Sequence, residues 1–346
     1  MYLRNSWNVV AWSRDLGEKP LAITVMDENL VVFRDSEGIP AALEDRCPHR
    51  HLPLSLGCVA KGGIQCGYHG MVFDRDGKCL EVPSQPTIPP RAKVRAYPVA
   101  ERFGWVWVWM GDQVADPASI PDFSVLTLPG QRAVGGVKHV RANYKLVTDN
   151  LMELSHVCYV HQSTIGNPEF TAKGKMTSRR SDNGVHVLRL VDDVPPPPTY
   201  VLTGMLPAGK NIDRWQRIEF VSPSFVKINV GGKEAGTGAL DSDYAGGLGW
   251  WVMNAMTPET ATSTYYFWAA VRDYALDDPK IDELYLNQVG GAFEEDRIVL
   301  EAQQRVLETR PDSWDLALKA DAGSVEARRV LDAAIVLERG RAVKAA

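Results

Sequence analysis

Short apolar runs separated by turn residues fill the first third of the chain. Runs rich in Val, Ile, Leu and Phe that are bounded by Gly, Asp, Asn and Pro are typical of β-strands joined by turns. In the segment 103–110, Trp105, Trp107 and Trp109 alternate with valines, and this period of two indicates a strand with a tryptophan face. The strands predicted in this region are 23–26, 30–34, 41–44, 71–73, 94–99 and 103–110.

Longer elements follow a loop that contains Pro117 and Pro121, and we place a boundary there between domains 1–115 and 116–346. Apolar positions at helical spacing predict a helix over 143–160. Strands are predicted at 185–191, 215–221, 225–230, 250–256 and 264–271, and helices at 277–308 and 324–339. This order predicts an α+β fold with a long antiparallel sheet in the second domain. The Gly-rich segment 231–249 predicts a mobile loop over that sheet.

Composition and charge narrow the class of protein. The 346 residues are 45% hydrophobic and 23% charged, as in ordinary globular proteins, and the formal net charge is -5. A chain without a basic surplus lacks the surface that nucleic-acid phosphates require, so nucleic acid is excluded as a partner. Neither a signal-peptide pattern nor a long uninterrupted apolar run is present. We therefore expect a cytoplasmic protein without a membrane partner.

Two short motifs in the N-terminal domain combine cysteine with histidine. Cys47 and His49 lie in Cys-Pro-His-Arg, and Cys66 and His69 follow sixteen residues later in Cys-Gly-Tyr-His-Gly. Two thiolates and two imidazoles are the ligand set of a Rieske [2Fe-2S] cluster, in which one iron takes the sulfurs and the other takes the histidines. The alternative is a structural zinc site, but zinc motifs usually separate paired ligands by two or more residues. The motifs therefore predict an electron-carrying cluster.

A second candidate metal site begins on the predicted helix 143–160. His156 and His161 lie five residues apart, or about 140° around an ideal helix, so a shared metal requires a bulge or helix end near Cys158. A carboxylate would complete the two-histidine, one-carboxylate triad that binds Fe(II). Asp296 on the predicted helix 277–308 is a candidate. Taken alone, the two histidines are better explained as hydrogen-bonded structural residues, but beside a Rieske motif the iron site is favoured.

With both sites in view, the chain resembles the oxygenase component of the Rieske non-heme iron oxygenases over its whole length. It looks most like the branch of vanillate O-demethylase, toluenesulfonate methyl-monooxygenase and dicamba monooxygenase. Besides the two Cys-His motifs, the features that carry this resemblance are Arg4-Asn5-Ser6-Trp7, Asn143-Tyr144-Lys145-Leu146, Asp149-Asn150-Leu151-Met152, Tyr159-Val160-His161, Asp213-Arg214-Trp215-Gln216, Thr257-Pro258-Glu259-Thr260 and Glu295-Asp296.

The resemblance implies roles for particular residues. His156, His161 and Asp296 would hold the mononuclear iron, with Asn150 close to it. It also implies a Rieske β-domain followed by a helix-grip catalytic domain, in a head-to-tail homotrimer where the cluster of one subunit faces the iron of the next.

Two positions depart from the family pattern: Glu153, and His51, where small residues are commoner. Glu153 stands where the family usually has an aspartate that bridges the two sites, here His69 of one subunit and His156 of its neighbour. Glutamate keeps the charge but adds a methylene, and we assign the bridging role to Glu153.

The activity implied is oxygen insertion into a methyl or methoxy group of an aromatic acid, for example O-demethylation of a vanillate-like substrate with formaldehyde release. The electrons would come from NADH through a separate flavin and iron-sulfur reductase, because no nucleotide-binding Gly-x-Gly-x-x-Gly motif is present. Lys227, Arg217 and Asn254, on the sheet expected to floor the pocket, are candidates to bind the acid group. Two alternatives remain: ring dihydroxylation, and a Rieske electron carrier without its own catalytic iron.

Overall fold

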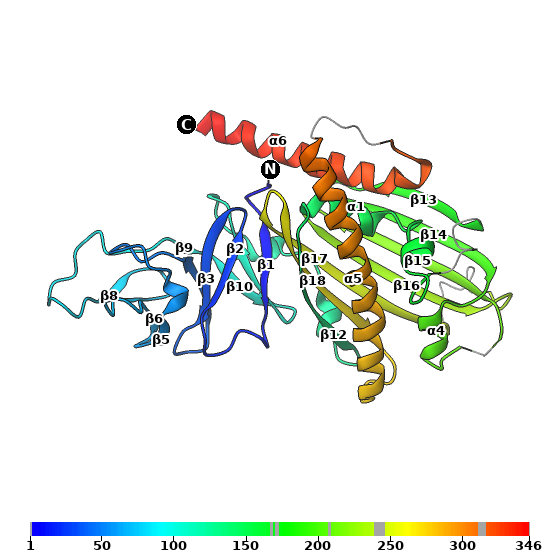
Figure 1. Ribbon diagram of the computed structural model, residues 1–346, viewed down its shortest axis with the longest axis horizontal. Helices are drawn as coiled ribbons and strands as arrows, with labels where there is room; N and C mark the ends of the chain where they lie inside the picture. The colour runs from blue at the N-terminus through cyan, green and yellow to red at the C-terminus, as the bar shows by residue number, and fades with distance from the viewer. Residues whose placement is uncertain are drawn as a thin grey trace. The chain divides into compact units, whose positions relative to one another are not determined.

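The computed structural model describes residues 2–166, 169, 173–206, 209–238, 246–310 and 316–345. The chain forms two compact units, one made of Met1–Asp122 with Thr257–Ala261 and the other of Phe123–Met256 with Thr262–Ala346 (Figure 1). The predicted boundary after residue 115 lies slightly before the end of the first unit's main segment. The division into domains 1–115 and 116–346 remains a proposal.

The first unit is built from three small sheets. Their strand orders are β1-β11-β10, β2-β3-β4-β9 and β5-β6-β7-β8. The strands are β1 (Trp7–Trp12), β2 (Leu21–Val25), β3 (Glu28–Arg34), β4 (Pro40–Glu44), β5 (Cys58–Ala60), β6 (Gly63–Gln65), β7 (Val72–Phe73), β8 (Cys79–Glu81), β9 (Ala96–Tyr97), β10 (Val99–Arg102) and β11 (Trp105–Trp109). The six predicted strands are present, although 94–99 is divided between β9 and β10. The short strands β1, β5, β6 and β8 were not predicted.

The tryptophans of β11 lie in the core of the first unit. Trp105 packs edge-on against Trp12 with a centroid distance of 5.4 Å, and Trp109 packs against Trp7 at 5.6 Å. The intervening Val106 and Val108 are also fully buried, so both faces of this strand are covered. The predicted strand with a tryptophan face is therefore confirmed, and the apolar valines between the tryptophans bury the other face as well.

The second unit contains a seven-stranded sheet in the order β12-β18-β17-β16-β15-β14-β13. The strands are β12 (Arg132–Val140), β13 (Lys175–Arg180), β14 (Gly184–Val194), β15 (Ile212–Val221), β16 (Phe225–Glu234), β17 (Leu248–Thr260) and β18 (Ser263–Arg272). The helices are α1 (Tyr144–Met152), α2 (Val157–Val160), α4 (Pro198–Leu202), α5 (Pro279–Thr309) and α6 (Ala322–Ala345). Short 3-10 helices occur at Leu54–Leu56 and Pro117–Ser119 in the first unit and at Ser124–Leu126 and Lys319–Asp321 in the second.

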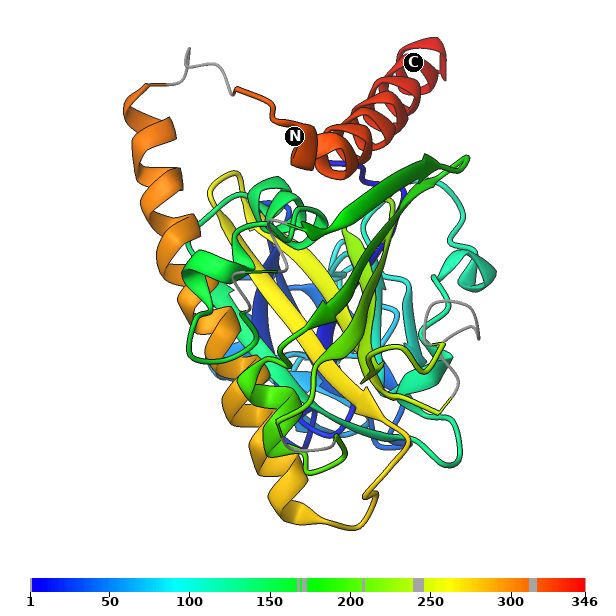
Figure 2. The same cartoon turned by 90° about the vertical axis from the view of Figure 1, so that its right-hand side faces the viewer.

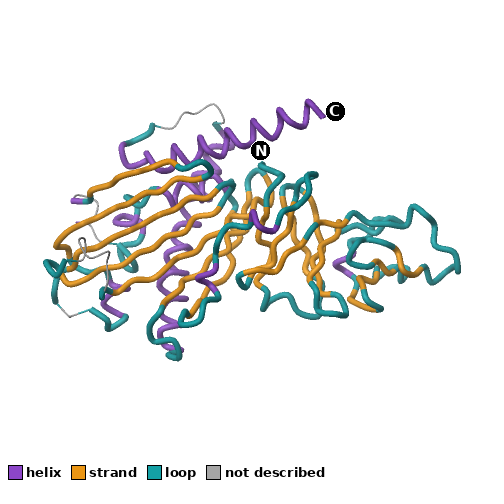
Figure 3. Tube along the Cα trace, turned by 180° about the vertical axis from the view of Figure 1, so that it is seen from behind, coloured by secondary structure: helices purple, strands orange, loops and turns teal. Residues whose placement is uncertain are grey.

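The helices of the second unit lie on one face of its sheet. Figure 2 shows α5 running along this face, and Figure 3 shows the strands from the opposite side, in front of the helices. The α+β class, the antiparallel sheet and the two long closing helices agree with the sequence prediction. Two of the strands, β12 and β13, were not predicted, because β12 contains the pair Gly135-Gly136 and β13 is largely exposed and polar.

The predicted helix over 143–160 is interrupted, and the predicted loop over 231–249 is shorter than expected. Glu153 has an extended backbone (φ -122°, ψ 107°), and its carboxylate accepts a hydrogen bond from the Ser155 N–H at 2.6 Å, so the chain leaves the helix here. The helix end expected near Cys158 is also present, because α2 ends at Val160 and His161 is not helical (φ -109°, ψ 37°). The strand β16 extends into the start of the predicted loop, to Glu234, and β17 begins within its end, at Leu248. Gly231 fits into β16 beside the Trp215 ring because it has no Cβ; a Cβ there would lie 2.0 Å from that ring. Residues 239–245 lie outside the described part of the chain.

Candidate metal centres

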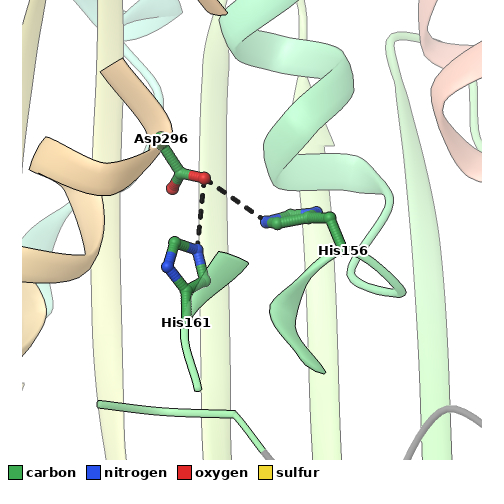
Figure 4. A group of neighbouring side chains, drawn as sticks. All are labelled: His156, His161 and Asp296. Carbon is green, nitrogen blue, oxygen red and sulfur yellow. Dashed lines mark ion pairs between the residues drawn. The ribbon is translucent and has the colours of Figure 1, made fainter. Parts of the chain in front are cut away.

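Three side chains from two separate segments converge in the second unit. His156 precedes α2, His161 follows it, and Asp296 lies on α5 (Figure 4). The Oδ1 atom of Asp296 is 3.1 Å from Nε2 of His161 and 3.5 Å from Nε2 of His156. One potential ligand atom from each residue lies within 4.8 Å of the others. Because α2 ends at Val160 and His161 is no longer helical, two histidines five residues apart can face one point, as the sequence required.

The outer nitrogen of each imidazole is held by an acceptor. Nδ1 of His156 is 2.7 Å from the backbone O of Glu153, and Nδ1 of His161 is 2.8 Å from Oε2 of Glu295. An acceptor at Nδ1 favours the tautomer with its proton on Nδ1, which leaves the Nε2 lone pair facing Asp296. The pair of contacts therefore orients both rings toward a shared position.

Burial and charge act differently on the two histidines. Burial lowers the pKa of His156, which keeps this ring neutral and able to donate a lone pair. Burial also acts to lower the pKa of His161, but the carboxylates of Asp296 and Glu295 outweigh it and raise that pKa. Two imidazoles and one carboxylate fit the donor set of an Fe(II) centre with open positions.

Asn150 lies beside this group, as the resemblance implied. Its Nδ2 donates a hydrogen bond to Oδ1 of Asp296 at 3.0 Å and is 3.4 Å from Nε2 of His156. Asn150 is on the last turn of α1, so this short helix and α5 together fix the carboxylate.

A cavity opens beside the three residues and lies within the second unit. The space between its lining residues, counted together with the part open to solvent, is about 640 Å³. The apolar part of its wall includes Leu151, Leu154, Ile165, Ile228, Val230 and Phe293, and the polar groups away from the histidines are Thr199, Tyr200, Arg214 and Gln216. A mostly apolar pocket with a few polar groups is typical of a site for a small aromatic molecule.

The three residues predicted to bind the acid group do not line this cavity, and that prediction is wrong. Lys227 and Arg217 lie on the opposite face of the sheet, where Lys227 forms an ion pair with Glu219 at 2.9 Å. Asn254 is fully buried elsewhere: it donates to the Val226 carbonyl at 2.9 Å and accepts from the Tyr266 hydroxyl at 2.7 Å. Its role is therefore structural.

The error for the two basic residues is one of strand parity. Side chains alternate between the faces of a strand, and the neighbours Gln216 and Ile228 are the ones that line the cavity. Arg214 and Gln216 were missed as site residues. The signal was available, because both belong to the segment Asp213-Arg214-Trp215-Gln216 that carries the family resemblance.

The four residues of the Cys-His motifs meet in the first unit. The rings of His49 and His69 are 4.4 Å apart and exposed, whereas Cys47 and Cys66 are each 2% exposed. Burial raises the pKa of the Cys47 thiol, and the neighbouring Cys66 adds to this. Paired buried thiols behind paired exposed imidazoles fit a Rieske cluster whose histidine-bound iron lies nearer to the surface.

The two motif loops repeat one hydrogen-bond pattern. The Cys47 N–H donates to Leu52 O at 2.9 Å, and the Cys66 N–H donates to Met71 O at 2.8 Å. In each loop the residue before that acceptor has positive φ: His51 at 61° and Gly70 at 75°. His51 therefore occupies a left-handed loop position that glycine fills in the other loop.

Glu153 has one side of its expected bridge within the chain. Its Oε2 is 4.0 Å from Nδ1 of His156, and its side chain is largely buried. The other side would be His69 of a neighbouring subunit, so the bridging role stays a prediction.

Family models match both units of the chain. The Rieske [2Fe-2S] domain matches residues 6–98, and the vanillate O-demethylase oxygenase C-terminal domain matches residues 140–337. Within the described residues, none of the helices is both long and apolar enough to cross a membrane.

Curated relatives and solved structures match nearly the full length. A putative toluene-4-sulfonate monooxygenase system iron-sulfur subunit of Comamonas testosteroni is 37% identical over 98% of this chain and 99% of its own. A vanillate O-demethylase oxygenase subunit of a Pseudomonas species is 38% identical over 98% and 96%. The crystal structure of dicamba monooxygenase bound to dicamba superposes with a TM-score of 0.89 and 32% identity, covering 98% of this chain and 99% of that one.

A Rieske domain followed by a domain with two histidines and one aspartate at a cavity defines a class of oxidoreductase, the oxygenase component of a Rieske non-heme iron oxygenase. The chain belongs to the Rieske oxygenase family that carries the vanillate O-demethylase oxygenase C-terminal domain, together with O-demethylases and methyl monooxygenases.

Proposed function

We propose that this chain is the terminal oxygenase of a multicomponent system that uses O2 and NADH-derived electrons to hydroxylate a methyl or methoxy group of an aromatic acid. The observation that carries the proposal is the convergence of His156, His161 and Asp296 at one end of an apolar cavity. The relatives named above are described as acting on toluene-4-sulfonate, vanillate and dicamba. For a methoxy substrate the balanced reaction converts ArOCH3, O2, NADH and a proton into ArOH, formaldehyde, water and NAD+.

In this proposal His156, His161 and Asp296 hold Fe(II), which supplies activation of O2 when bound. The chain itself does the positioning. Asn150 fixes the Asp296 carboxylate through its 3.0 Å hydrogen bond. The apolar wall orients an aromatic ring and excludes water, which protects the reaction from side products.

Cys47 and Cys66 would bind one iron of the [2Fe-2S] cluster, and His49 and His69 the other. The buried thiols and exposed imidazoles support this assignment. Domain 1–115 would then be the electron-carrying domain and 116–346 the catalytic domain with the mononuclear iron. Glu153 would connect the two centres between subunits.

Three features of the assembly belong to the proposal. A flavin and iron-sulfur reductase would deliver the electrons, since relatives are described as oxygenase subunits or components of larger systems. The oxygenase would form a homotrimer, and sedimentation of the holoenzyme should give about three chain masses; a stable monomer would contradict this. NADH chemistry favours a cytoplasmic location.

The direct test combines the purified oxygenase, Fe(II), NADH and a flavin and iron-sulfur reductase with methoxylated and methylated aromatic acids. The expected result is about one formaldehyde per NADH from a methoxy acid, or a benzylic alcohol from a methyl acid. A His161→Ala variant should still accept electrons into its cluster but form no product. A ring diol that keeps its methoxy group would support dihydroxylation instead, and His161→Ala turnover at the wild-type rate would contradict the proposal.

A further inference from the structure

Arg214 places a positive charge in the wall of the cavity. It lies on β15, is 2% exposed, and among the described residues that line the cavity it is the one arginine or lysine. Its Nη2 donates to the Ile165 carbonyl O at 3.3 Å, and its guanidinium carbon is 5.0 Å from the ring centroid of Tyr200. These contacts hold the guanidinium in place within a wall that is otherwise mostly apolar.

Two hydrogen-bond donors lie in the same wall. The Tyr200 hydroxyl and the Trp250 indole Nε1 are buried, and neither N–H nor O–H has an acceptor within hydrogen-bond geometry among the described residues; the Arg214 guanidinium near the hydroxyl is itself a donor. Both residues line the cavity, and their rings meet edge-on at 4.7 Å. Buried polar groups in proteins are nearly always hydrogen-bonded, so donors left over in a cavity wall point to a ligand that accepts.

Tyr200 stays a donor over the physiological pH range. Burial raises the pKa of its phenol, and the nearby Arg214 guanidinium opposes this only in part. A neutral hydroxyl, an indole N–H and a guanidinium therefore come together from α4, β17 and β15. Their shared preference is for an acceptor group with negative charge.

We propose that Arg214, with Tyr200 and Trp250, binds the carboxylate or sulfonate of the substrate and so selects aromatic acids over neutral aromatics. A guanidinium presents a planar fork of donors that matches the oxygens of such a group. This inference rests on the proposed function, because it specifies the substrate class of the same cavity. It transfers the acid-binding role from the opposite face of the sheet, where Arg217 and Lys227 lie, to the cavity itself.

The test measures binding without turnover. Calorimetry on the anaerobic holoenzyme, with no reductase present, gives dissociation constants for 4-methoxybenzoate and for the uncharged 4-methoxybenzamide. Wild type should bind the acid more tightly than the amide. Arg214→Met should weaken acid binding by about 30-fold or more, since it removes a charge-assisted contact, and change amide binding by about threefold or less.

Arg217→Met is the matched control, because Arg217 is on the same strand but exposed on the other face. It should leave both dissociation constants unchanged. Tyr200→Phe keeps the ring and removes only the hydroxyl, and it should weaken acid binding by about five- to tenfold. If Arg214→Met does not fold, Tyr200→Phe and Arg214→Lys decide. An acid-to-amide preference equal to wild type in every folded variant at Arg214 and Tyr200 would overturn the inference.

The inference and the proposed function fail in different ways. Acid binding that depends on Arg214, without formaldehyde or alcohol from any substrate, would sustain this inference and refute the proposed reaction. Demethylation by an Arg214→Met variant with unchanged acid-to-amide preference in both binding and KM would refute this inference and sustain the proposed reaction.

Discussion

Two hydrogen bonds decide which ring nitrogens of His156 and His161 face Asp296. The acceptor for His156 is a backbone carbonyl, which mutation cannot easily remove, whereas the acceptor for His161 is the side chain of Glu295. Glu295 also lies 3.5 Å from the Thr164 hydroxyl, which donates to it. Its carboxylate is thus a positioning group for one candidate ligand.

We predict that Glu295→Ala weakens Fe(II) binding by about 10- to 100-fold, the range typical of losing a partner that orients a metal-binding histidine. Glu295→Gln, which keeps an acceptor for Nδ1–H, should recover part of this loss. Competition with a chelator on anaerobic protein measures the affinity. The EPR signal of the reduced cluster should not change.

The neighbouring Glu294 provides the control for this prediction. It is 44% exposed and pairs with Arg297 and Lys138, away from His161. Glu294→Ala should bind Fe(II) as wild type does. Wild-type affinity in Glu295→Ala would show that His161 needs no partner at Nδ1.

At the level of single residues, the metal ligands were easier to predict from the sequence than the residues that line the cavity. The thiol and imidazole ligands were predicted from the spacing of the Cys and His residues, whereas Asp296, one of 43 acidic residues, was assigned through the family resemblance. The substrate residues were not predicted correctly, since the choice between Arg214 and Arg217, or Ile228 and Lys227, depends on which face of a strand meets the helices. The sequence alone does not distinguish a charged residue on the buried face of a strand from one on the exposed face.

Among the elements, the helix end expected near Cys158 is present where α2 stops at Val160, but the interruption between α1 and α2 was not expected. The chain leaves α1 at Glu153, whose carboxylate accepts from the Ser155 N–H and whose backbone carbonyl holds His156. A local contact of this kind depends on rotamers that a sequence pattern does not specify.

The long helix α5 carries Asp296, and ion pairs of Asp282 in its first turn hold it against the sheet. Asp282 accepts hydrogen bonds from Arg132 at 2.5 Å and from the buried Arg272 at 2.7 Å. Arg272 is 1% exposed at its side chain, so removing its carboxylate partner leaves a buried charge poorly compensated. The backbone carbonyls of Tyr274 and Ala275 still accept from this guanidinium.

We predict that Asp282→Asn lowers the free energy of unfolding by about 2 to 3 kcal/mol at neutral pH, at the lower end for a broken buried pair. For a unit of this size the melting temperature should fall by roughly 5 to 10 °C. Arg132→Ala, which removes a half-exposed partner, should cost about 1 kcal/mol or less. Equal stability of Asp282→Asn and wild type would show that α5 is held by other contacts.

The same pair predicts a pH dependence. Burial acts to raise the pKa of Asp282, but the bonds from Arg132 and Arg272 outweigh it and hold this pKa below the ordinary value of 3.8. A carboxyl group with a lower pKa in the folded chain stabilises the fold above that ordinary value, and the contribution disappears as the pH falls through the lowered pKa. The stability difference between wild type and Asp282→Asn should therefore be full at pH 6 and shrink below about pH 4. A constant difference would contradict this assignment.

For the whole molecule, the class of fold was predictable because its two signals are strong: short β-runs with Cys-His motifs, then a long sheet with closing helices. Which face of that sheet the helices cover was not predictable, and therefore the side chains that line the cavity were not predictable either. Those depend on contacts between segments far apart in sequence, such as His161 with Glu295. The central claim is that one chain carries both a Rieske cluster and a separate iron.

Iron and acid-labile sulfide per chain, measured on anaerobically purified protein after addition of Fe(II) and removal of the excess, test this claim most directly. About three irons and two sulfides are expected, with the low average g value of a histidine-ligated cluster after reduction. In His161→Ala the iron should fall to about two while sulfide stays the same. Two irons and two sulfides in wild type would leave only an electron carrier, and zinc without sulfide would contradict the account altogether.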